Sequence, residues 1–182
     1  DPNRWWNAQA GIVSSMLFEP LIRTDAYTGA RFPALATGEP TLGDDNVTYT
    51  FKLRDGVKFH GDNGMFSAAD VKFSWERLMS RDLGAESGFI FTGVPIVGLG
   101  AFLDGSADEI SGIRVIDDLT LEVELERPDS AFLPAFGYGT ASIVCKAYYE
   151  NKPFEEVNYA PVGTGPFLLE SVDHATGARL AR

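Results

Sequence analysis

The sequence predicts a mixed α and β domain, because two strand-hairpin patterns and one amphipathic helix occur in a chain long enough to bury one core. The chain has 182 residues, of which 45% are apolar and 23% are charged. This composition is typical of a folded globular domain and excludes a disordered chain or a coiled coil. At roughly 150 residues per domain, the length predicts one domain, or one domain with an embedded subdomain.

The first half of the chain begins with a predicted helix and continues with a predicted hairpin. Residues 12–22 carry apolar side chains at helical spacing and end near Pro20, which indicates a short helix. Residues 48–54 alternate strictly between apolar and polar side chains, as a half-buried strand does. Because Asp55-Gly56 is a turn dipeptide, we expect residues 57–59 to return as the second strand of this hairpin.

A second helix is expected over residues 68–79. Ser67 is a favourable N-cap residue, and Asp70 follows it at the spacing of a capping box. Three apolar residues then fall on one helical face, and they are Val71, Trp75 and Leu78. This face predicts that the helix packs against a sheet or a core.

The second half of the chain is expected to contain another hairpin among short helices. Residues 113–115 and 121–125 alternate around the turn Asp117-Asp118, so they predict two paired strands. Glu122, Glu124 and Glu126 alternate with apolar residues and are therefore expected on the solvated face of the sheet. The remaining expected elements are short helices near 98–103, 130–136 and 146–150, a rigid turn over 161–166, and strands over 167–172 and from 178 onward.

The net charge argues against nucleic acid and anionic membranes as partners. Lysine and arginine number 15, whereas aspartate and glutamate number 26, so the formal net charge is −11. The longest uncharged stretch, Ser87 to Leu103, contains four glycines and Pro95, which excludes a membrane-spanning helix there. The start at Asp1, without a basic and apolar leader, fits either a cytosolic protein or a mature form whose leader has been removed.

The reactive side chains do not form a recognisable catalytic or metal site. Cys145 is the only cysteine and lies in an apolar run, so we expect a buried, inert thiol. His60 and His174 have no second ligand at metal-binding spacing, and no phosphate loop or nucleophile elbow occurs. The sequence therefore predicts no catalytic residue, no metal and no cofactor.

Two strings in the first half of the chain carry a family resemblance. Residues 48–60 read TYTFKLRDGVKFH and residues 66–74 read FSAADVKFS, and this combination resembles the solute-binding proteins of the oligopeptide, dipeptide and nickel ABC transporters. Other motifs follow in that family's order and at its spacing, and they are Asp1-Pro2, residues 17–21, residues 33–36, residues 111–121 and residues 161–166. The resemblance covers nearly the whole chain.

The resemblance implies a periplasmic-binding-protein type II-like α/β fold, of which this chain is the first lobe with an inserted α+β subdomain. Residues 1–38 and 160–182 would form the sheet-forming part of lobe I, and residues 39–159 would form the insertion. Members of this family are several times longer, so the resemblance also implies that the second lobe is absent from this chain.

The function implied by the resemblance is capture of a solute between two lobes and its delivery to an ABC permease, without chemistry on the solute. The expected solute is an oligopeptide or an oligosaccharide-like molecule, and the expected location is the periplasm or the outer face of the cytoplasmic membrane, with or without a lipid anchor. Two alternatives stay open at this point. One is a sensory or regulatory module on the same fold, and the other is a glycan-hydrolysing enzyme, which turnover would reveal.

The resemblance also indicates which residues would contact the solute. By position, the family lines its cleft with the segment that reads Trp5, Trp6, Asn7 and Ala8 in this chain. Some peptide binders have an acidic residue where this chain has Trp6, and an indole ring favours stacking on a sugar ring instead. The other expected contacts are Phe89 and Phe91 in the irregular segment, and Tyr138 between two glycines. Packing in the core is the alternative role for each of these aromatic residues.

Overall fold

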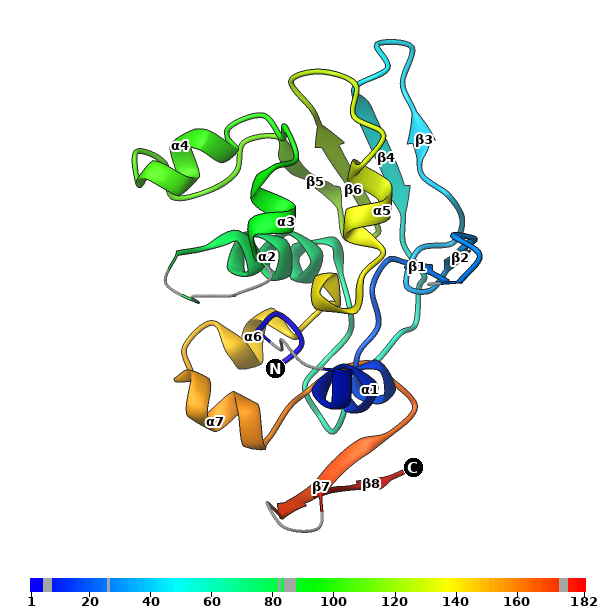
Figure 1. Cartoon of the computed structure of the whole chain (residues 1–182), viewed down its shortest axis with the longest axis vertical. Coiled ribbons are helices and arrows are strands. Elements are labelled where there is room, and N and C mark those ends of the chain that lie inside the picture. The colour runs from blue at the N-terminus through cyan, green and yellow to red at the C-terminus, as the bar shows by residue number, and fades with distance from the viewer. Residues whose placement is uncertain (5–7, 26, 82, 84–87, 174–176) are drawn as a thin grey trace.

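The computed structural model describes residues 1–4, 8–25, 27–81, 83, 88–173 and 177–182, and of residues 8, 9, 88 and 89 it describes only the backbone. Runs of helices and runs of short strands follow one another along the chain (Figure 1). The first half contains α1 (Ala8–Leu17), β1 (Ile22–Thr24), β2 (Arg31–Pro33), β3 (Thr41–Leu42), β4 (Thr48–Lys52), α2 (Ala68–Met79) and α3 (Gly88–Thr92). The second half contains α4 (Leu99–Asp104), β5 (Ile113–Asp117), β6 (Thr120–Glu124), α5 (Phe132–Phe136), the 3₁₀ helix η1 (Gly139–Ala141), α6 (Lys146–Tyr149), α7 (Phe154–Tyr159), β7 (Leu168–Asp173) and β8 (Gly177–Ala181). In the described part of the chain, no helix is long and apolar enough to cross a membrane.

The largest described sheet is antiparallel and has four strands, in the order β3-β4-β6-β5. The predicted hairpin of β5 and β6 is confirmed, with Ile113 opposite Val123. Leu121 and Val123 are fully buried on one face, whereas Glu122 and Glu124 lie on the other face and remain partly exposed. This alternation places the apolar face of the sheet against α2 (Figure 1).

The predicted hairpin between residues 48–54 and 57–59 is wrong. The two edges of β4 are occupied by β3 and β6, and Phe51 lies opposite Leu121. Residues 57–59 turn away from β4 after Gly56, and Phe59 is buried beside Phe66, with its ring centroid 6.4 Å from that ring. Burial of Phe59 and pairing with the distant β6 therefore outweigh the local turn signal of Asp55-Gly56.

Helix α2 begins and ends as the sequence predicts. Its capping box is formed by Ser67, whose backbone N–H and Oγ both donate to Oδ2 of Asp70, at 2.9 and 2.8 Å. The other carboxylate oxygen of Asp70 accepts the backbone N–H of Lys146 at 2.8 Å. Asp70 therefore ties the start of α2 to the start of α6.

We expect the stability contributed by Asp70 to fall as the pH rises. Burial raises the pKa of Asp70 above 3.8, so the folded protein holds this proton more tightly than the unfolded chain does. The contribution is thus complete below the unfolded pKa and is lost as the pH rises through the folded pKa. Asp70→Asn should destabilise the protein by about 1–2 kcal/mol near pH 4, through loss of the cap. The difference in urea midpoint from wild type should shrink between pH 4 and pH 7.

Asp45→Asn is the control for this experiment, because its effect on stability should change with pH in the opposite direction. Hydrogen bonds from the Thr48 side chain and then from the Val47 backbone lower the pKa of Asp45. The difference between Asp45→Asn and wild type should therefore grow, from a small value, as the pH rises from acid conditions. A difference for Asp70→Asn that also grew with pH would show that the hydrogen bonds, and not burial, dominate at this carboxyl group.

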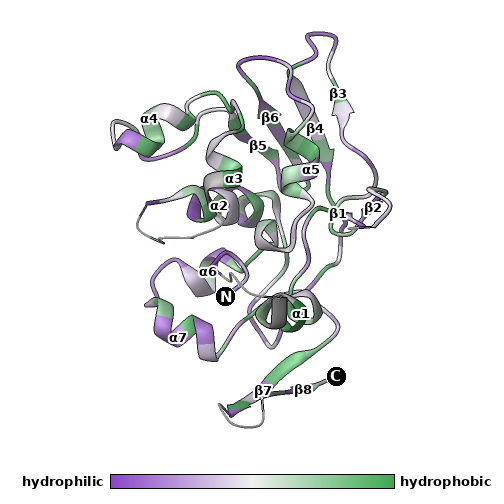
Figure 2. Cartoon of the chain, viewed as in Figure 1, coloured by the Kyte–Doolittle hydropathy of each residue, from purple (hydrophilic) through white to green (hydrophobic). Residues whose placement is uncertain are grey.

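Aromatic rings fill the space between the sheet and the helices. Trp75 of α2 lies 4.4 Å from the ring of Phe136 and 6.0 Å from that of Phe51, measured between centroids. Phe132 and Phe91 complete this cluster, and all five rings are buried. Figure 2 shows the hydrophobic colouring of α5, the short helix that brings Phe132 and Phe136 to the core.

Helix α1 runs from Ala8 to Leu17, so it begins and ends earlier than the sequence predicts. The turn over residues 161–167 crosses its end and supplies the hydrogen bonds that another helical turn would have made. Gly165 N–H donates to the carbonyl of Leu17 at 2.9 Å, and Phe167 N–H donates to the carbonyl of Met16 at 3.2 Å. The chain then continues into the antiparallel hairpin of β7 and β8, which projects from the rest of the molecule (Figure 1).

Candidate functional site

A pocket of about 390 Å³ opens beside Tyr138, where α1, β1 and the loop after α5 meet. Tyr138 is 57% exposed, so its ring is available to a ligand. The lining comes from two stretches of the chain that are far apart in sequence, and its residues are Ser15, Phe18, Pro20, Arg23, Thr24, Asp25, Gly29, Gly137, Tyr138, Gly139 and Ser142. The pocket therefore depends on the tertiary structure and not on any one motif.

The glycine before Tyr138 is required by the close approach of β1. A Cβ atom at Gly137 would lie 2.0 Å from Oγ1 of Thr24, which is far inside van der Waals contact. Thr24 N–H donates to the carbonyl of Gly137 at 3.3 Å, so the end of β1 and the residue after α5 are joined directly. Because α5 ends here, its aromatic residues turn inward while Tyr138 turns toward the pocket.

An aspartate turn contributes to the rim of the pocket. Oδ1 of Asp25 accepts the N–H groups of Tyr27 and Thr28, at 3.0 and 2.7 Å, and also the Thr28 hydroxyl at 2.8 Å. These bonds, with the Thr28 backbone first, lower the pKa of Asp25, so its carboxylate stays ionised at neutral pH. Arg23 on the same rim supplies the opposite charge. The pocket thus combines an aromatic face with one cation and one anion.

A second depression, of about 500 Å³, shares Arg23 with this pocket. It is lined by charged residues and by the exposed ring of Phe32, and its residues are Glu19, Arg23, Phe32, Pro33, Ala34, Leu35, Arg54 and Val57. Its charged groups are partly engaged within the protein, since Glu19 accepts the Thr164 hydroxyl at 3.0 Å and Arg54 Nε donates to the Ala36 carbonyl at 3.3 Å.

The expected contact residues differ in where the structure places them. Tyr138 lines the pocket, whereas Phe91 is fully buried and packs on Phe136 with 5.2 Å between ring centroids. Phe91 has no surface to offer a solute and is omitted from the site proposed below. Trp5, Trp6 and Asn7 lie outside the described residues, and the side chains of Ala8 in α1 and Phe89 in α3 are likewise not described.

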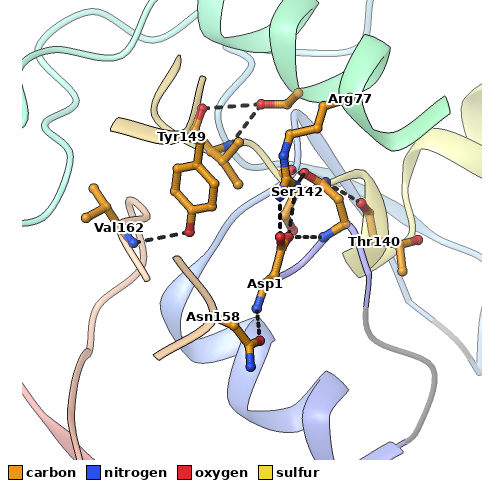
Figure 3. Close-up of polar contacts among 10 residues, drawn as sticks. Asp1, Arg77, Thr140, Ser142, Tyr149, Asn158 and Val162 are labelled. Carbon is orange, nitrogen blue, oxygen red and sulfur yellow. Dashed lines mark hydrogen bonds and ion pairs between the residues drawn. The ribbon is translucent and has the colours of Figure 1, made fainter. Parts of the chain in front are cut away.

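The segment that leads into Trp5 is fixed by a buried polar network (Figure 3). Arg77 of α2 forms an ion pair with the carboxylate of Asp1, and Arg77 Nη1 also donates to Oδ1 of Asn3 at 2.9 Å. The side-chain amide of Asn3, which is fully buried, donates to the carbonyls of Thr140 and Ser142, at 2.8 and 3.2 Å. The network therefore joins the N-terminal segment to the loop that carries Tyr138.

The histidine and cysteine that the structure describes both have structural roles. Nε2 of His60 lies 2.8 Å from the carbonyl of Gly165, and Nδ1 accepts the N–H of Gly163 at 3.3 Å. Cys145 is buried, and burial raises the pKa of its thiol, as expected for an inert cysteine. Within the described ranges, no group of three or more His, Cys, Asp or Glu side chains could hold a metal ion.

Comparison with known families gives a match over most of the chain. Residues 32–182 match the bacterial extracellular solute-binding proteins, family 5 Middle. The chain belongs to this family. The resemblance found in the two strings of the first half is thus confirmed, as is the periplasmic-binding-protein type II-like fold class.

Relatives within family 5 include named binding proteins and a solved structure. Di/tripeptide-binding protein 3 of Pseudomonas aeruginosa (strain UCBPP-PA14) is 32% identical over 168 residues, which cover 86% of this chain and 30% of that protein. Heme-binding protein A of Haemophilus influenzae is 32% identical over 158 residues, which cover 79% of this chain and 26% of that protein. The substrate-binding domain of an oligopeptide ABC transporter from Bacillus anthracis has a TM-score of 0.84 and 29% identity, and the match covers 100% of this chain and 35% of that chain.

The chain therefore spans about a third of the length of these family 5 proteins. The proteins named above are binding proteins.

Two features of the site were not anticipated from sequence, namely the buried Asn3 and its contact with Arg77. A polar residue next to Asp1-Pro2 gives no signal of burial, because its partners lie 74 or more residues away.

Proposed function

We propose that this chain is part of the solute-binding component of an ABC importer, which captures a short peptide between two lobes and delivers it to a membrane permease. The observation that carries the proposal is the family 5 match over residues 32–182. The relatives that bind dipeptides and tripeptides by name, and the oligopeptide transporter domain of similar structure, favour a peptide as the solute. The description of the matched family as extracellular supports a location outside the cytoplasm.

The proposed contacts on this lobe are the N-terminal residues Trp5–Ala8 and the pocket around Tyr138. An aromatic face with one cation and one anion suits a peptide, which has apolar side chains and two charged ends. The proposed division of the lobe assigns residues 1–38 and 160–182 to its sheet-forming part and residues 39–159 to the insertion. Closure of a second lobe would complete the site and exclude water.

An oligosaccharide-like solute is the second candidate, and the adjacent Trp5 and Trp6 favour it. Indole rings stack on the flat faces of sugar rings, and Trp6 offers a peptide ammonium group no carboxylate. The two candidates make opposite predictions for the same experiment.

The full-length protein should be tested by thermal shift against a pool of di- and tripeptides and a pool of oligosaccharides. Peptides at about 100 times Kd should stabilise it by about 2.7 kcal/mol. Tyr138→Ala should weaken peptide binding about tenfold, because the stacking face is lost. The solute should be recovered unchanged, since the site described contains no catalytic arrangement.

Tyr159→Ala is the matched control, because Tyr159 in α7 has the same 57% exposure as Tyr138 and does not line the pocket. It should bind peptides as wild type does. Stabilisation by oligosaccharides alone, lost in Trp6→Ala, would replace the peptide proposal with the sugar proposal. Cleavage of either pool would contradict both.

A further inference from the structure

We propose that the second depression, which shares Arg23 with the pocket around Tyr138, binds a carboxylate group of the solute through Arg23 and Arg54. The proposal rests on the proposed function, in which a peptide occupies the pocket around Tyr138. The ligand is either the free C-terminus of that peptide or one of its acidic side chains. Arg54 makes the site distinct from the pocket, because Arg54 lines only the second depression.

Two arginines supply the positive charge of the second depression. Arg23 and Arg54 are both exposed, and within the described part of the chain neither forms an ion pair with a carboxylate. The lining also contains the carboxylate of Glu19, which accepts the Thr164 hydroxyl at 3.0 Å. The lining residues thus carry two cations and one anion, although the formal net charge of the chain is −11. Such a local excess of positive charge attracts an anionic group.

Arg54 is held in place by the backbone of the segment that forms part of the depression. Its N–H donates to the carbonyl of Leu35 at 2.9 Å, and its Nε donates to the carbonyl of Ala36 at 3.3 Å. A guanidinium group has five N–H donors in one plane, and the bond to Ala36 uses only one of them. The donors on the two Nη atoms are therefore available to a carboxylate, which arginine binds through charge-assisted hydrogen bonds.

Arg23 lies beside an apolar surface. Arg23 of β1 and Phe32 of β2 are directly opposite each other, so their side chains project from the same face of this strand pair. The ring of Phe32 is 55% exposed, and residues 33–35 continue the lining. An apolar surface next to two guanidinium groups suits a carboxylate on an organic molecule better than an inorganic anion.

The shared Arg23 indicates which charged group of a peptide would lie in the second depression. The pocket around Tyr138 balances Arg23 with the carboxylate of Asp25, whereas the second depression adds the cation Arg54. The more positive end of this continuous surface is thus in the second depression. A peptide in the pocket would therefore extend into the depression with a carboxylate and not with its ammonium group.

The test compares each peptide that binds with its uncharged analogues. The full-length protein is titrated by calorimetry with the peptides found by thermal shift and with their C-terminal amides. A second set of analogues has glutamine or asparagine in place of each glutamate or aspartate of the peptide. Loss of the bound carboxylate should raise Kd at least tenfold. An effect of amidation would identify the C-terminus as the bound group, and an effect of the second set would identify an acidic side chain.

Arg54→Gln is the decisive variant, because it removes a charge from the second depression and leaves the lining of the pocket around Tyr138 unchanged. It should weaken binding of the acid form about tenfold and leave Kd of the uncharged analogue unchanged. A merely structural role of Arg54 would weaken binding of both forms. Arg54→Lys keeps the charge and should retain part of the preference for the acid form. Arg23→Gln should also reduce this preference, and it decides by the same criterion if Arg54→Gln does not fold.

Arg31→Gln is the matched control. It removes the same charge from the neighbouring position in β2, but Arg31 pairs with Glu39 at 3.0 Å and is not a lining residue of either the pocket or the depression. Its preference for the acid form should equal that of wild type.

Two results would overturn the carboxylate site and leave the proposed function intact. The first is equal affinity of wild type for the acid and uncharged forms of every peptide that binds. The second is a wild-type preference for the acid form in a folded Arg54→Gln protein, because the carboxylate would then be bound elsewhere. If wild type binds no peptide, the proposed function fails and the carboxylate site fails with it.

Discussion

Replacing Gly163 by valine is expected to destabilise the fold by at least about 3 kcal/mol. A Cβ atom at this position would lie 2.1 Å from the carbonyl oxygen of Leu17 and 2.6 Å from Cδ1 of Phe18. The obstructing oxygen belongs to the backbone and accepts the N–H of Gly165, so it cannot move without loss of that bond. The valine would separate the 161–167 turn from the end of α1. Urea denaturation followed by circular dichroism should show a lower midpoint with an unchanged slope.

Gly100→Val provides the matched control for Gly163→Val. Gly100 lies in α4, and no atom outside its own helix and chain neighbours lies within 4 Å of a Cβ placed there. Because valine has a somewhat higher helix propensity than glycine, the control should be neutral or slightly stabilising. If Gly163→Val had the midpoint of wild type, the turn and α1 would have to separate at no cost, and the close contact described here would be wrong.

Replacing Trp75 by alanine is expected to cost about 3–5 kcal/mol of folding free energy. Trp75 is among the largest fully buried side chains of the described residues, and it lies between the rings of Phe51 and Phe136. Its Nε1–H donates to the carbonyl of Ala141 at 3.3 Å, so the ring also holds the last residue of η1. The substitution would leave a cavity at the centre of the aromatic cluster and an unsatisfied carbonyl beside it.

One further variant separates the contributions of volume and hydrogen bonding at Trp75, and a second variant is a surface control. Trp75→Phe keeps an aromatic ring but loses the donor, so it should cost about 1–2 kcal/mol. Tyr27→Ala removes an aromatic ring that is almost completely exposed, and it should change the stability by less than about 0.5 kcal/mol. A Trp75→Ala protein within about 1 kcal/mol of wild type would show that the cluster repacks, and that this helix face is not the centre of the core.

Helix α2 packs against the sheet and also holds the segment that follows α5, through Ser74, Trp75 and Arg77. Ser74 Oγ accepts the N–H of Val144 at 2.9 Å, Trp75 donates to Ala141, and Arg77 reaches the same loop through Asn3. About one turn of α2 therefore holds several residues of the segment after α5. The segment that carries Tyr138 is thus held by α2, the longest helix that the structure describes, and such support favours a preformed pocket.

Local patterns in the sequence determined much of the fold. The start of α2 follows from Ser67 and Asp70, whose capping contacts span only three residues. The hairpin of β5 and β6 follows from alternation over residues 113–125, and burial of Leu121 and Val123 confirms the predicted face. Family membership was also readable, because its motifs are contiguous strings such as residues 48–60. Each of these features depends on neighbours along the chain, so a short window of sequence contains its cause.

Only the tertiary structure decided the features that join distant parts of the chain. β4 pairs with β6, about 70 residues away, because both strands bury one apolar face under α2, and this burial outweighs the Asp55-Gly56 turn signal. Gly163 is required by the end of α1, and Asn3 is buried because Arg77, Thr140 and Ser142 surround it. The physical reason is the same in each case. Close packing and buried hydrogen bonds depend on which segments meet in space, and local propensity contains no information on that meeting.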